Sequence, residues 1–239
     1  MSATQIAIPA IVQDIQVNDA SSRMMSDMAR PAAVDHRMKR VIDVMISSLA
    51  LAFLVIIPLL PLLALLVMLD GGPVLFSHRR IGIHNKPFGC LKFRTMRVNA
   101  EQALAEYLAV NPVAASEWEV RRKLHNDPRV TRWGSFLRAT SLDELPQLIN
   151  VLRGEMSLIG PRPVVLAELE EKYCAAGRTA YVSTRPGITG LWQISGRSDT
   201  SYAERVRLDI AYVSTWSLQQ DLLILTRTIP AVLSRRGAV

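Results

Sequence analysis

The chain has 239 residues, with 28 lysine and arginine residues against 21 aspartate and glutamate residues, and so a formal net charge of +7 and an isoelectric point near 9.8. This length fits one domain with appendages or two small domains. The two cysteines, Cys90 and Cys174, lie far apart with no His/Cys cluster beside them, which argues against a zinc site and predicts free thiols in a reducing compartment.

Hydrophobic residues make up 49% of the chain, and a large share of them lies between residues 44 and 69. The basic excess therefore belongs mostly to the rest of the chain. Beside a membrane segment, a basic surface favours anionic lipid or phosphate-rich substrates over nucleic acid. Residues 1–37 show no sustained periodicity and predict a disordered leader. A secretory signal is excluded, because the apolar run begins too late and no cleavage site follows it.

Residues 38–70 predict a membrane helix, because the apolar run exceeds the roughly 20 residues that a helix needs to cross a bilayer. Pro58 and Pro61 interrupt the run, however, and proline kinks or breaks a helix. Basic residues also flank both ends, which the positive-inside bias allows only if the helix enters, bends at Pro58 and leaves by the same face. A kinked single crossing stays open, because membrane helices tolerate proline. The flanking residues are Arg37, Lys39, Arg40, Arg79, Arg80 and Lys86.

Residues 71–239 predict one mostly helical domain with a few short strands, which is an α-dominated α+β fold. Strands are expected at 74–78, 88–93 and 191–194, and a loop at 157–163. Helices are expected at 100–110, 116–124, 133–138, 141–152, 164–176, 202–213 and 218–233.

Two adjacent carboxylates, Asp143 and Glu144, lie at the start of the helix predicted at 141–152. A structural explanation is available, because Ser141 and Glu144 form an S-x-x-E capping box and acids suit the first turn of a helix. Pro146 complicates it, since a proline just past the first turn costs a hydrogen bond, and a helix starting at Pro146 is the alternative. An ionised aspartate can attack phosphorus, and a neighbouring glutamate can hold a magnesium ion.

Arg162 lies between Pro161 and Pro163, which restrict its backbone. A fixed guanidinium suits a phosphate, although a rigid structural turn explains the same pattern. Each of the other candidates, taken singly, is more often part of a turn or a solvated face; they are Lys92, Arg94, Arg129, Arg138, Gln193 and Arg197. The sequence has no P-loop, no Rossmann fingerprint and no zinc motif, and its four histidines lack metal-ligand spacing.

From Lys39 to the C-terminus, these motifs together resemble the bacterial sugar transferases, also called monotopic phosphoglycosyl transferases. The family starts exopolysaccharide and O-antigen assembly. Several ordered motifs coincide, which makes the resemblance far more specific than one short motif. The matching segments are 92–96 (KFRTM), 127–129 (DPR), 137–138 (LR), 141–148 (SLDELPQL), 150–152 (NVL), 156–163 (MSLIGPRP), 185–193 (RPGITGLWQ) and 195–197 (SGR).

The resemblance implies a ping-pong reaction on the cytoplasmic face of the bacterial inner membrane. The aspartate that matches Asp143 attacks the sugar-linked phosphate of a UDP-sugar and releases UMP, and undecaprenyl phosphate then takes the phosphosugar. Glu144 matches a residue that holds Mg²⁺, and Arg138 and Arg162 match phosphate-binding positions. The family's membrane element is a re-entrant helix broken at a proline, which matches Pro58.

The resemblance also extends to the sugar and the domain arrangement. The pattern from residue 192 to residue 205 looks like the hexose-transferring exopolysaccharide type, which suggests glucose or galactose. Large relatives carry additional membrane helices first, so we expect this chain to be a minimal form. The oligomeric state stays open, a homodimer included.

Two other classes of function compete with transfer. A non-catalytic scaffold could keep the fold and recruit polysaccharide machinery, but the intact pair of Asp143 and Glu144 argues against it. A basic peripheral protein could bind anionic lipid or nucleic acid, in which case its activity would respond to salt and not to Asp143.

Overall fold

The computed structural model describes residues 36–121, 124–195 and 201–233, which form a mostly helical chain with four short strands in that part. The predicted α-dominated α+β composition is therefore confirmed. The N-terminal half contains α2 (Arg37–Ile56), α3 (Leu59–Leu69), β1 (Leu75–Ile81), η2 (Ile83–Asn85), β2 (Pro87–Phe93), α4 (Ala100–Val110) and α5 (Pro112–Arg121). The C-terminal half contains α6 (Arg132–Thr140), η3 (Leu142–Glu144), α7 (Gln147–Arg153), β3 (Ser157–Ile159), α8 (Leu166–Lys172), α9 (Ala175–Val182), β4 (Gly187–Thr189), α10 (Leu191–Ile194), α11 (Tyr202–Ser214) and α12 (Leu218–Leu233).

The apolar segment forms two helices that meet at a sharp bend. α2 and α3 lie at 67° to each other, and Pro58 is the residue that begins α3, so the predicted break at this proline is confirmed. No single helix among the described residues has the length and apolar character of a membrane span, whereas the bent pair reaches both together. Its outer faces expose large apolar side chains, among them Met45, Leu49, Phe53, Ile56, Leu62, Leu65 and Leu69.

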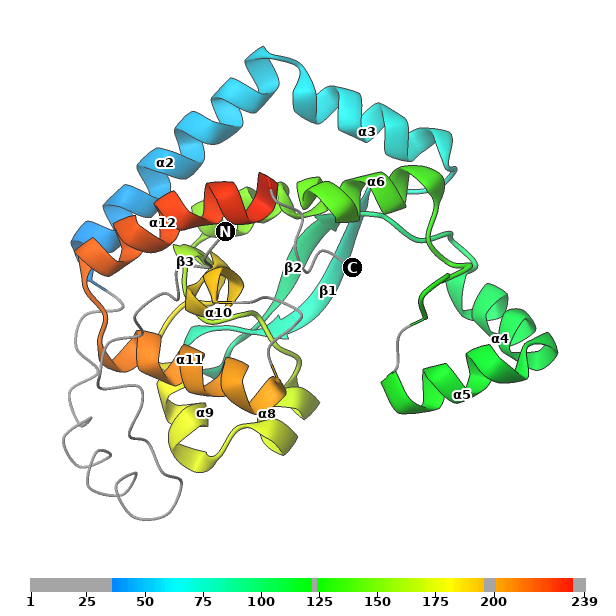
Figure 1. Ribbon diagram of the computed structural model, residues 1–239. Coiled ribbons are helices and arrows are strands. Elements are labelled where there is room, and N and C mark those ends of the chain that lie inside the picture. Colours follow the sequence, from blue (N-terminus) through cyan, green and yellow to red (C-terminus); the bar gives the residue numbers. More distant parts are fainter. Residues whose placement is uncertain (1–35, 122–123, 196–200, 234–239) are drawn as a thin grey trace, which may run out of the picture.

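Both ends of the bent pair are attached to the body of the protein, while the bend projects away from it (Figure 1). α2 contacts α7 and β3, and α3 packs Leu63 and Val67 against Phe93 and Leu137. After α3 the chain turns through Gly71 and Gly72, whose φ angles of 72° and 86° favour glycine.

The buried face of α2 is polar, which is the reverse of a helix in a water-soluble protein. The ammonium group of Lys39 lies 2.6 Å from Asp221 of α12, and both side chains are buried. Asp221 also accepts hydrogen bonds from the Tyr212 hydroxyl at 2.7 Å and the Trp216 indole at 3.0 Å. One turn further along α2, Asp43 accepts from the Ser157 hydroxyl at 2.7 Å and the Leu158 amide at 3.2 Å. These contacts, called the polar seam below, fix α2 to the body.

The β1–β2 hairpin is antiparallel, with Phe76 opposite Lys92, His78 opposite Cys90 and Arg80 opposite Phe88. Because side chains alternate between the faces of a strand, these six residues share one face. Asn150 of α7 holds the outer edge of β2 through bonds with the Leu91 amide at 2.9 Å and the Gly89 carbonyl at 2.8 Å. The hairpin is thereby attached to the helix that follows the carboxylate pair.

Three local expectations were wrong. Ser141 does not cap the N-terminus of a helix over 141–152, and its side chain makes no capping hydrogen bond. It ends α6 in the left-handed conformation, residues 142–144 form the short turn η3, and α7 begins at Gln147 after Pro146. The alternative start at Pro146 is confirmed, and the proline is the reason, because it cannot donate the bond that a helix through it needs. Residues 191–194 form helix α10, not a strand, and the helix expected at 164–176 is split into α8 and α9.

Two strands were missed: β3, which lies inside the region predicted as a loop at 157–163, and β4, with which it pairs in parallel. The two strands approach so closely at Gly160 that a Cβ added there would lie 2.5 Å from the Arg185 carbonyl oxygen. Glycine is therefore required at this crossing. Gly160 is followed directly by the turn that contains Arg162.

The polar seam makes a prediction about stability. We expect the Lys39→Met variant to lose about 3 kcal/mol of unfolding free energy, because it leaves the buried Asp221 carboxylate without its cation. Thermal unfolding of the detergent-solubilised protein measures the loss. The Lys39→Met/Asp221→Asn double variant is the control, since removal of both charges should restore most of the stability. A double variant no more stable than the single one would contradict this account of the seam.

Candidate active site

The carboxylate pair lies in η3, between the end of α6 and the start of α7. The left-handed turn at Ser141 reverses the chain and leaves Asp143 only 8% exposed, while the Glu144 side chain is 36% exposed. Lys92, at the end of β2, reaches both carboxylates: its Nζ lies 2.5 Å from Glu144 Oε1 and 3.8 Å from Asp143 Oδ2. The structure therefore brings together three of the residues selected from the sequence.

The surroundings of Asp143 change its protonation. Burial raises the pKa of the Asp143 carboxyl to about 6, with Lys92 opposing the rise, Glu144 adding to it and Arg138 opposing it. Burial lowers the pKa of Lys92, but Glu144 and Asp143 outweigh it and raise the pKa above its ordinary value. A desolvated carboxyl beside a fixed cation is the kind of group that active sites use.

Arg138 acts on the Asp143 carboxyl, and Arg129 acts on Arg138. The Arg138 Nε donates to the Thr95 hydroxyl at 2.9 Å; burial lowers the pKa of Arg138, against the pull of Asp143 and Asp127. Arg129 forms a forked pair with Asp127, Nε to Oδ1 at 2.8 Å and Nη2 to Oδ2 at 2.6 Å. Its guanidinium also lies 4.7 Å from the centre of the Trp118 ring, so the side chain is held from two sides.

Arg162 belongs to a different part of the site, at the turn after β3. Its guanidinium carbon lies 5.1 Å from the centre of the Trp192 ring, and Arg205 of α11 lies at the same distance from that ring. The backbone of Arg162 is bound by the buried carboxylate of Asp209, which also accepts from the Tyr173 hydroxyl at 3.0 Å. The restricted backbone expected from the flanking prolines is thus held by side chains as well.

The other residues selected from the sequence have structural contacts or lie elsewhere. Pro161 is fully buried and its carbonyl accepts from the Gly187 amide at 2.8 Å, and Pro163 is half-buried in the same turn. The Gln193 amide donates to the Ile188 carbonyl at 3.3 Å, and its Oε1 is buried without a partner among the described residues. Arg197 lies outside the described residues.

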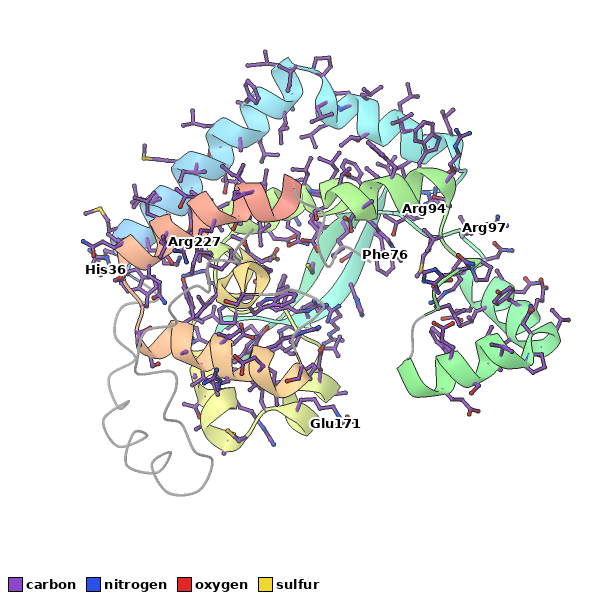
Figure 2. All side chains as sticks on the ribbon, in the orientation of Figure 1. His36, Phe76, Arg94, Arg97, Glu171 and Arg227 are labelled. Carbon is purple, nitrogen blue, oxygen red and sulfur yellow. The ribbon has the colours of Figure 1, made fainter. Side chains whose placement is uncertain are left out.

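Arg94 does not face the carboxylates. Its guanidinium donates to three carbonyls, of Pro73 at 2.7 Å, Met96 at 3.0 Å and Val67 at 3.1 Å, and the residue is 7% exposed. Figure 2 shows it near the turn that follows α3. Its role in the structure is therefore to join the end of α3 to the continuation of β2, and we do not include it in the proposed site.

Sequence reasoning missed two arginines that the structure brings near Arg162, and a histidine beside one of them. Arg80 was noted only as a flanking charge, and His78 and Arg205 were not singled out. The Arg80 Nη1 lies 3.6 Å from Glu168, and its Nη2 lies 3.2 Å from His78 Nδ1. The alternation of β1 places His78 and Arg80 on the face of Lys92, but the hairpin register was needed to use that signal.

Comparison with known proteins gives a consistent result. A model of the family described as "Bacterial sugar transferase" matches residues 34–235. The chain is 54% identical over 201 residues to the exopolysaccharide production protein ExoY of Sinorhizobium fredii, which covers 84% of this chain and 87% of that protein. It is 49% identical to the undecaprenyl-phosphate galactose phosphotransferase of Salmonella typhimurium, over 84% of this chain and 41% of that protein. It is 42% identical to the UDP-glucose:undecaprenyl-phosphate glucose-1-phosphate transferase of Caulobacter vibrioides, over 86% of this chain and 73% of that protein.

Asp209 makes stability depend on pH. Burial raises the pKa of its carboxyl to about 7 in the folded protein, although the Tyr173 and Arg162 hydrogen bonds oppose the rise, whereas the ordinary value is 3.8. Between these values the folded state keeps a proton that the unfolded state has lost, so stability falls as pH rises from about 4 to about 7. We expect the Asp209→Asn variant to lack this loss. Its melting temperature relative to the wild-type protein should rise by several degrees between pH 5 and pH 8, and a constant difference would contradict the assignment.

Proposed function

The chain belongs to the bacterial sugar transferase family, a family of sugar-phosphate transferases, and from this premise we propose that it transfers hexose-1-phosphate from a UDP-hexose to undecaprenyl phosphate. The products are undecaprenyl-diphosphate-hexose and UMP, and the reaction is the first step of exopolysaccharide or O-antigen assembly. Relatives named for galactose and for glucose transfer support a hexose donor. The observation on which the proposal depends is the buried carboxyl of Asp143 beside Lys92, Glu144 and Arg138.

The proposed mechanism has two steps at one phosphorus atom. A carboxylate oxygen of Asp143 bonds to the sugar-linked phosphorus, the bond from that phosphorus to the bridging oxygen breaks, and UMP leaves with the electron pair. An oxygen of undecaprenyl phosphate then attacks the same phosphorus, and the bond to Asp143 breaks, which restores the carboxylate. Two steps allow one site to serve a soluble donor and a lipid acceptor in turn.

Positive charge is what this chemistry requires most, because negative charge accumulates on the diphosphate in the transition state. Lys92 lies next to Asp143, and the Arg138 guanidinium acts on the same carboxyl. Both cations are held by the fold, Lys92 by its ion pair with Glu144 and Arg138 by its bond to Thr95. They can therefore stabilise the charge without first being reoriented.

Magnesium is the cofactor that we propose. No group of three or more acidic, histidine or cysteine side chains suited to a metal occurs within the described residues. Glu144, beside the nucleophile Asp143, is the carboxylate that would hold the ion. This donor set fits Mg²⁺, which proteins often bind through one or two carboxylates together with substrate phosphates. When bound, Mg²⁺ would neutralise charge on the donor's phosphates.

We also propose that the bent pair of α2 and α3 enters and leaves the bacterial cytoplasmic membrane by its cytoplasmic face. Both of its ends contact one body: Lys39 pairs with Asp221, and the Val67 carbonyl accepts from Arg94. The apolar side chains of its outer faces are those that a bilayer would cover. This arrangement holds the carboxylate pair near headgroup depth, where the phosphate of the lipid acceptor lies.

We expect the Asp143→Asn variant to lose UMP release by about a thousandfold or more, because an amide cannot form the phosphosugar bond. The assay follows UMP from UDP-glucose and UDP-galactose, with Mg²⁺ and undecaprenyl phosphate, on the full-length protein in nanodiscs. The Glu144→Gln variant should need more Mg²⁺ for half-maximal rate. Unchanged melting temperatures serve as the folding control.

Each rival function gives a different result in this assay. A wild-type protein that releases no UMP from any UDP-sugar would favour the scaffold. Turnover in the Asp143→Asn variant close to that of the wild-type protein would overturn the nucleophile assignment, and activity that followed salt alone would favour the peripheral binding protein.

The topology is tested by cysteine labelling of the Cys174→Ser variant, because Cys174 is exposed and Cys90 is buried. Single cysteines are added as Arg37→Cys and Val98→Cys, at exposed positions on the two sides of the bent pair. We expect an impermeant maleimide to label both in inverted membrane vesicles and neither in intact spheroplasts. If one cysteine is labelled in inverted vesicles and the other in intact spheroplasts, the helix pair is instead a kinked single crossing.

A further inference from the structure

Three arginines from separate elements converge at a distance from the carboxylate pair. Arg80 comes from β1, Arg162 from the turn after β3 and Arg205 from α11. The guanidinium carbons of Arg162 and Arg205 each lie 5.1 Å from the centre of the buried Trp192 ring. We call Arg80, Arg162 and Arg205 the arginine cluster.

The fold fixes Arg80 and Arg162 relative to each other through the residues that follow them. The Ile81 amide donates to the Val164 carbonyl at 3.0 Å. The Tyr181 hydroxyl donates to the Ile81 carbonyl at 2.8 Å and accepts from the Val164 amide at 3.1 Å. Tyr181 is only 2% exposed, so these bonds are shielded from water and the two arginines have little freedom to separate.

Arg162 repels each of the other two guanidinium groups. Burial lowers the pKa of Arg80, and Arg162 lowers it further; the same two causes, in the same order, lower the pKa of Arg205. Glu168 opposes the shift at both residues. A fold that holds like charges together bears an electrostatic cost that an anionic ligand would relieve.

The arginine cluster is connected to the carboxylate pair by one face of the β1–β2 hairpin. Lys92, His78 and Arg80 follow one another along this face, with Cys90 opposite His78. Burial lowers the pKa of His78, and Arg80 and Lys92 lower it further, as expected for a group between the two. Burial raises the pKa of the Cys90 thiol to about 11, and Lys92, Glu144, Arg80 and Arg162 all act on it.

The direction of the hairpin separates the arginine cluster from the bent pair. Phe93, opposite Leu75 at the open end, packs against Leu63 and Val67 of α3. Ile81, at the other end, packs against Leu169, Tyr181 and Val206 of α8, α9 and α11. At about 3.4 Å per residue, Arg80 lies roughly 17 Å along β1 from Leu75. A lipid phosphate would lie near α3, so this position favours a soluble ligand.

We propose that the arginine cluster is a second phosphate subsite, which binds the phosphate of the nucleoside monophosphate half of the donor. The sugar-linked phosphate then lies at Asp143. Because the two phosphorus atoms of a diphosphate share one oxygen, the Arg80 and Lys92 side chains must reach toward each other over His78 and Cys90, which lie between them on the hairpin face. Trp192 holds the guanidinium groups of Arg162 and Arg205 in place through cation–π contacts. This inference rests on the proposed function, because it takes a nucleoside diphosphate sugar as the donor.

UMP binding to the full-length protein in nanodiscs, measured by calorimetry, tests the subsite. We expect the Arg80→Gln variant to raise the Kd for UMP about tenfold, the loss of one charge-assisted contact. The Arg80→Lys variant should recover part of the affinity, because it keeps the charge and loses the fork. Arg205→Gln is a second variant from another element. The matched control is Arg79→Gln, which removes the same charge from the neighbouring, exposed residue on the opposite face of β1.

Two further measurements distinguish the source of the phosphate. Uridine, which lacks a phosphate, should bind the wild-type protein and the Arg80→Gln variant equally, and the KM for undecaprenyl phosphate should not change. A raised KM for the lipid with an unchanged Kd for UMP would assign the cluster to the acceptor and overturn the proposal. An equal loss of UMP affinity in the Arg79→Gln variant would also overturn the proposal, because the overall positive charge of the surface would then explain the binding of UMP.

The result for this subsite can be separated from the result for the proposed function. If the wild-type protein binds UMP through Arg80 but releases no UMP from UDP-sugars, the result supports the phosphate subsite and contradicts the proposed transferase reaction. If the wild-type protein turns over UDP-hexose, but the Arg80→Gln and Arg205→Gln variants both bind UMP with wild-type affinity, the result contradicts the subsite and leaves the proposed function intact. Melting temperatures of all variants identify any that fail to fold.

Discussion

The burial of charge along α2 is the constraint on which the rest of the structure depends. A helix that exposes Met45, Leu49 and Phe53 and buries Lys39 and Asp43 cannot slide or rotate against the body without leaving a buried ion unpaired. The same helix donates from Arg40 to the carbonyls of Val151 and Leu152, at the C-terminal end of α7. Since η3 immediately precedes α7, the polar seam fixes the position of the two carboxylates in η3 relative to the apolar helices.

The site is built from elements that are distant in sequence and joined by short polar contacts. The hairpin supplies Lys92 and Arg80, the turn after β3 supplies Arg162, and η3 supplies the carboxylates. Tight backbone crossings keep these pieces in register, as at Gly160, where no side chain fits. A substrate with two linked phosphates requires two basic groups that extend toward each other, and Arg80 and Lys92 lie on one hairpin face with His78 between them.

The sequence was most informative where a single residue type dictates the backbone. Pro58 predicted the bend, Pro146 predicted the true start of α7, and the motif around Asp143 predicted the carboxylate pair. It was least informative where pairing decides the structure: β3 and β4 have three residues each, too few for a visible alternation, and they are joined only in the folded chain. Arg80 and Arg205 were missed for the same reason, because their proximity to Arg162 comes from register and not from spacing. Arg94 shows the converse, since its motif suggested phosphate while its burial directs it to carbonyls.

The three carbonyls that Arg94 gathers have a mechanical consequence. They belong to the last turns of α3, the turn after it and the residues that follow β2, so one side chain clamps three segments that would otherwise hinge at the two glycines. Lys92 lies two residues from this clamp. In the proposed reaction, a tilt of α3 would therefore reach Lys92 through a stiff joint rather than be absorbed by a loop, and the bent pair would act on the candidate site as well as attach it to the bilayer.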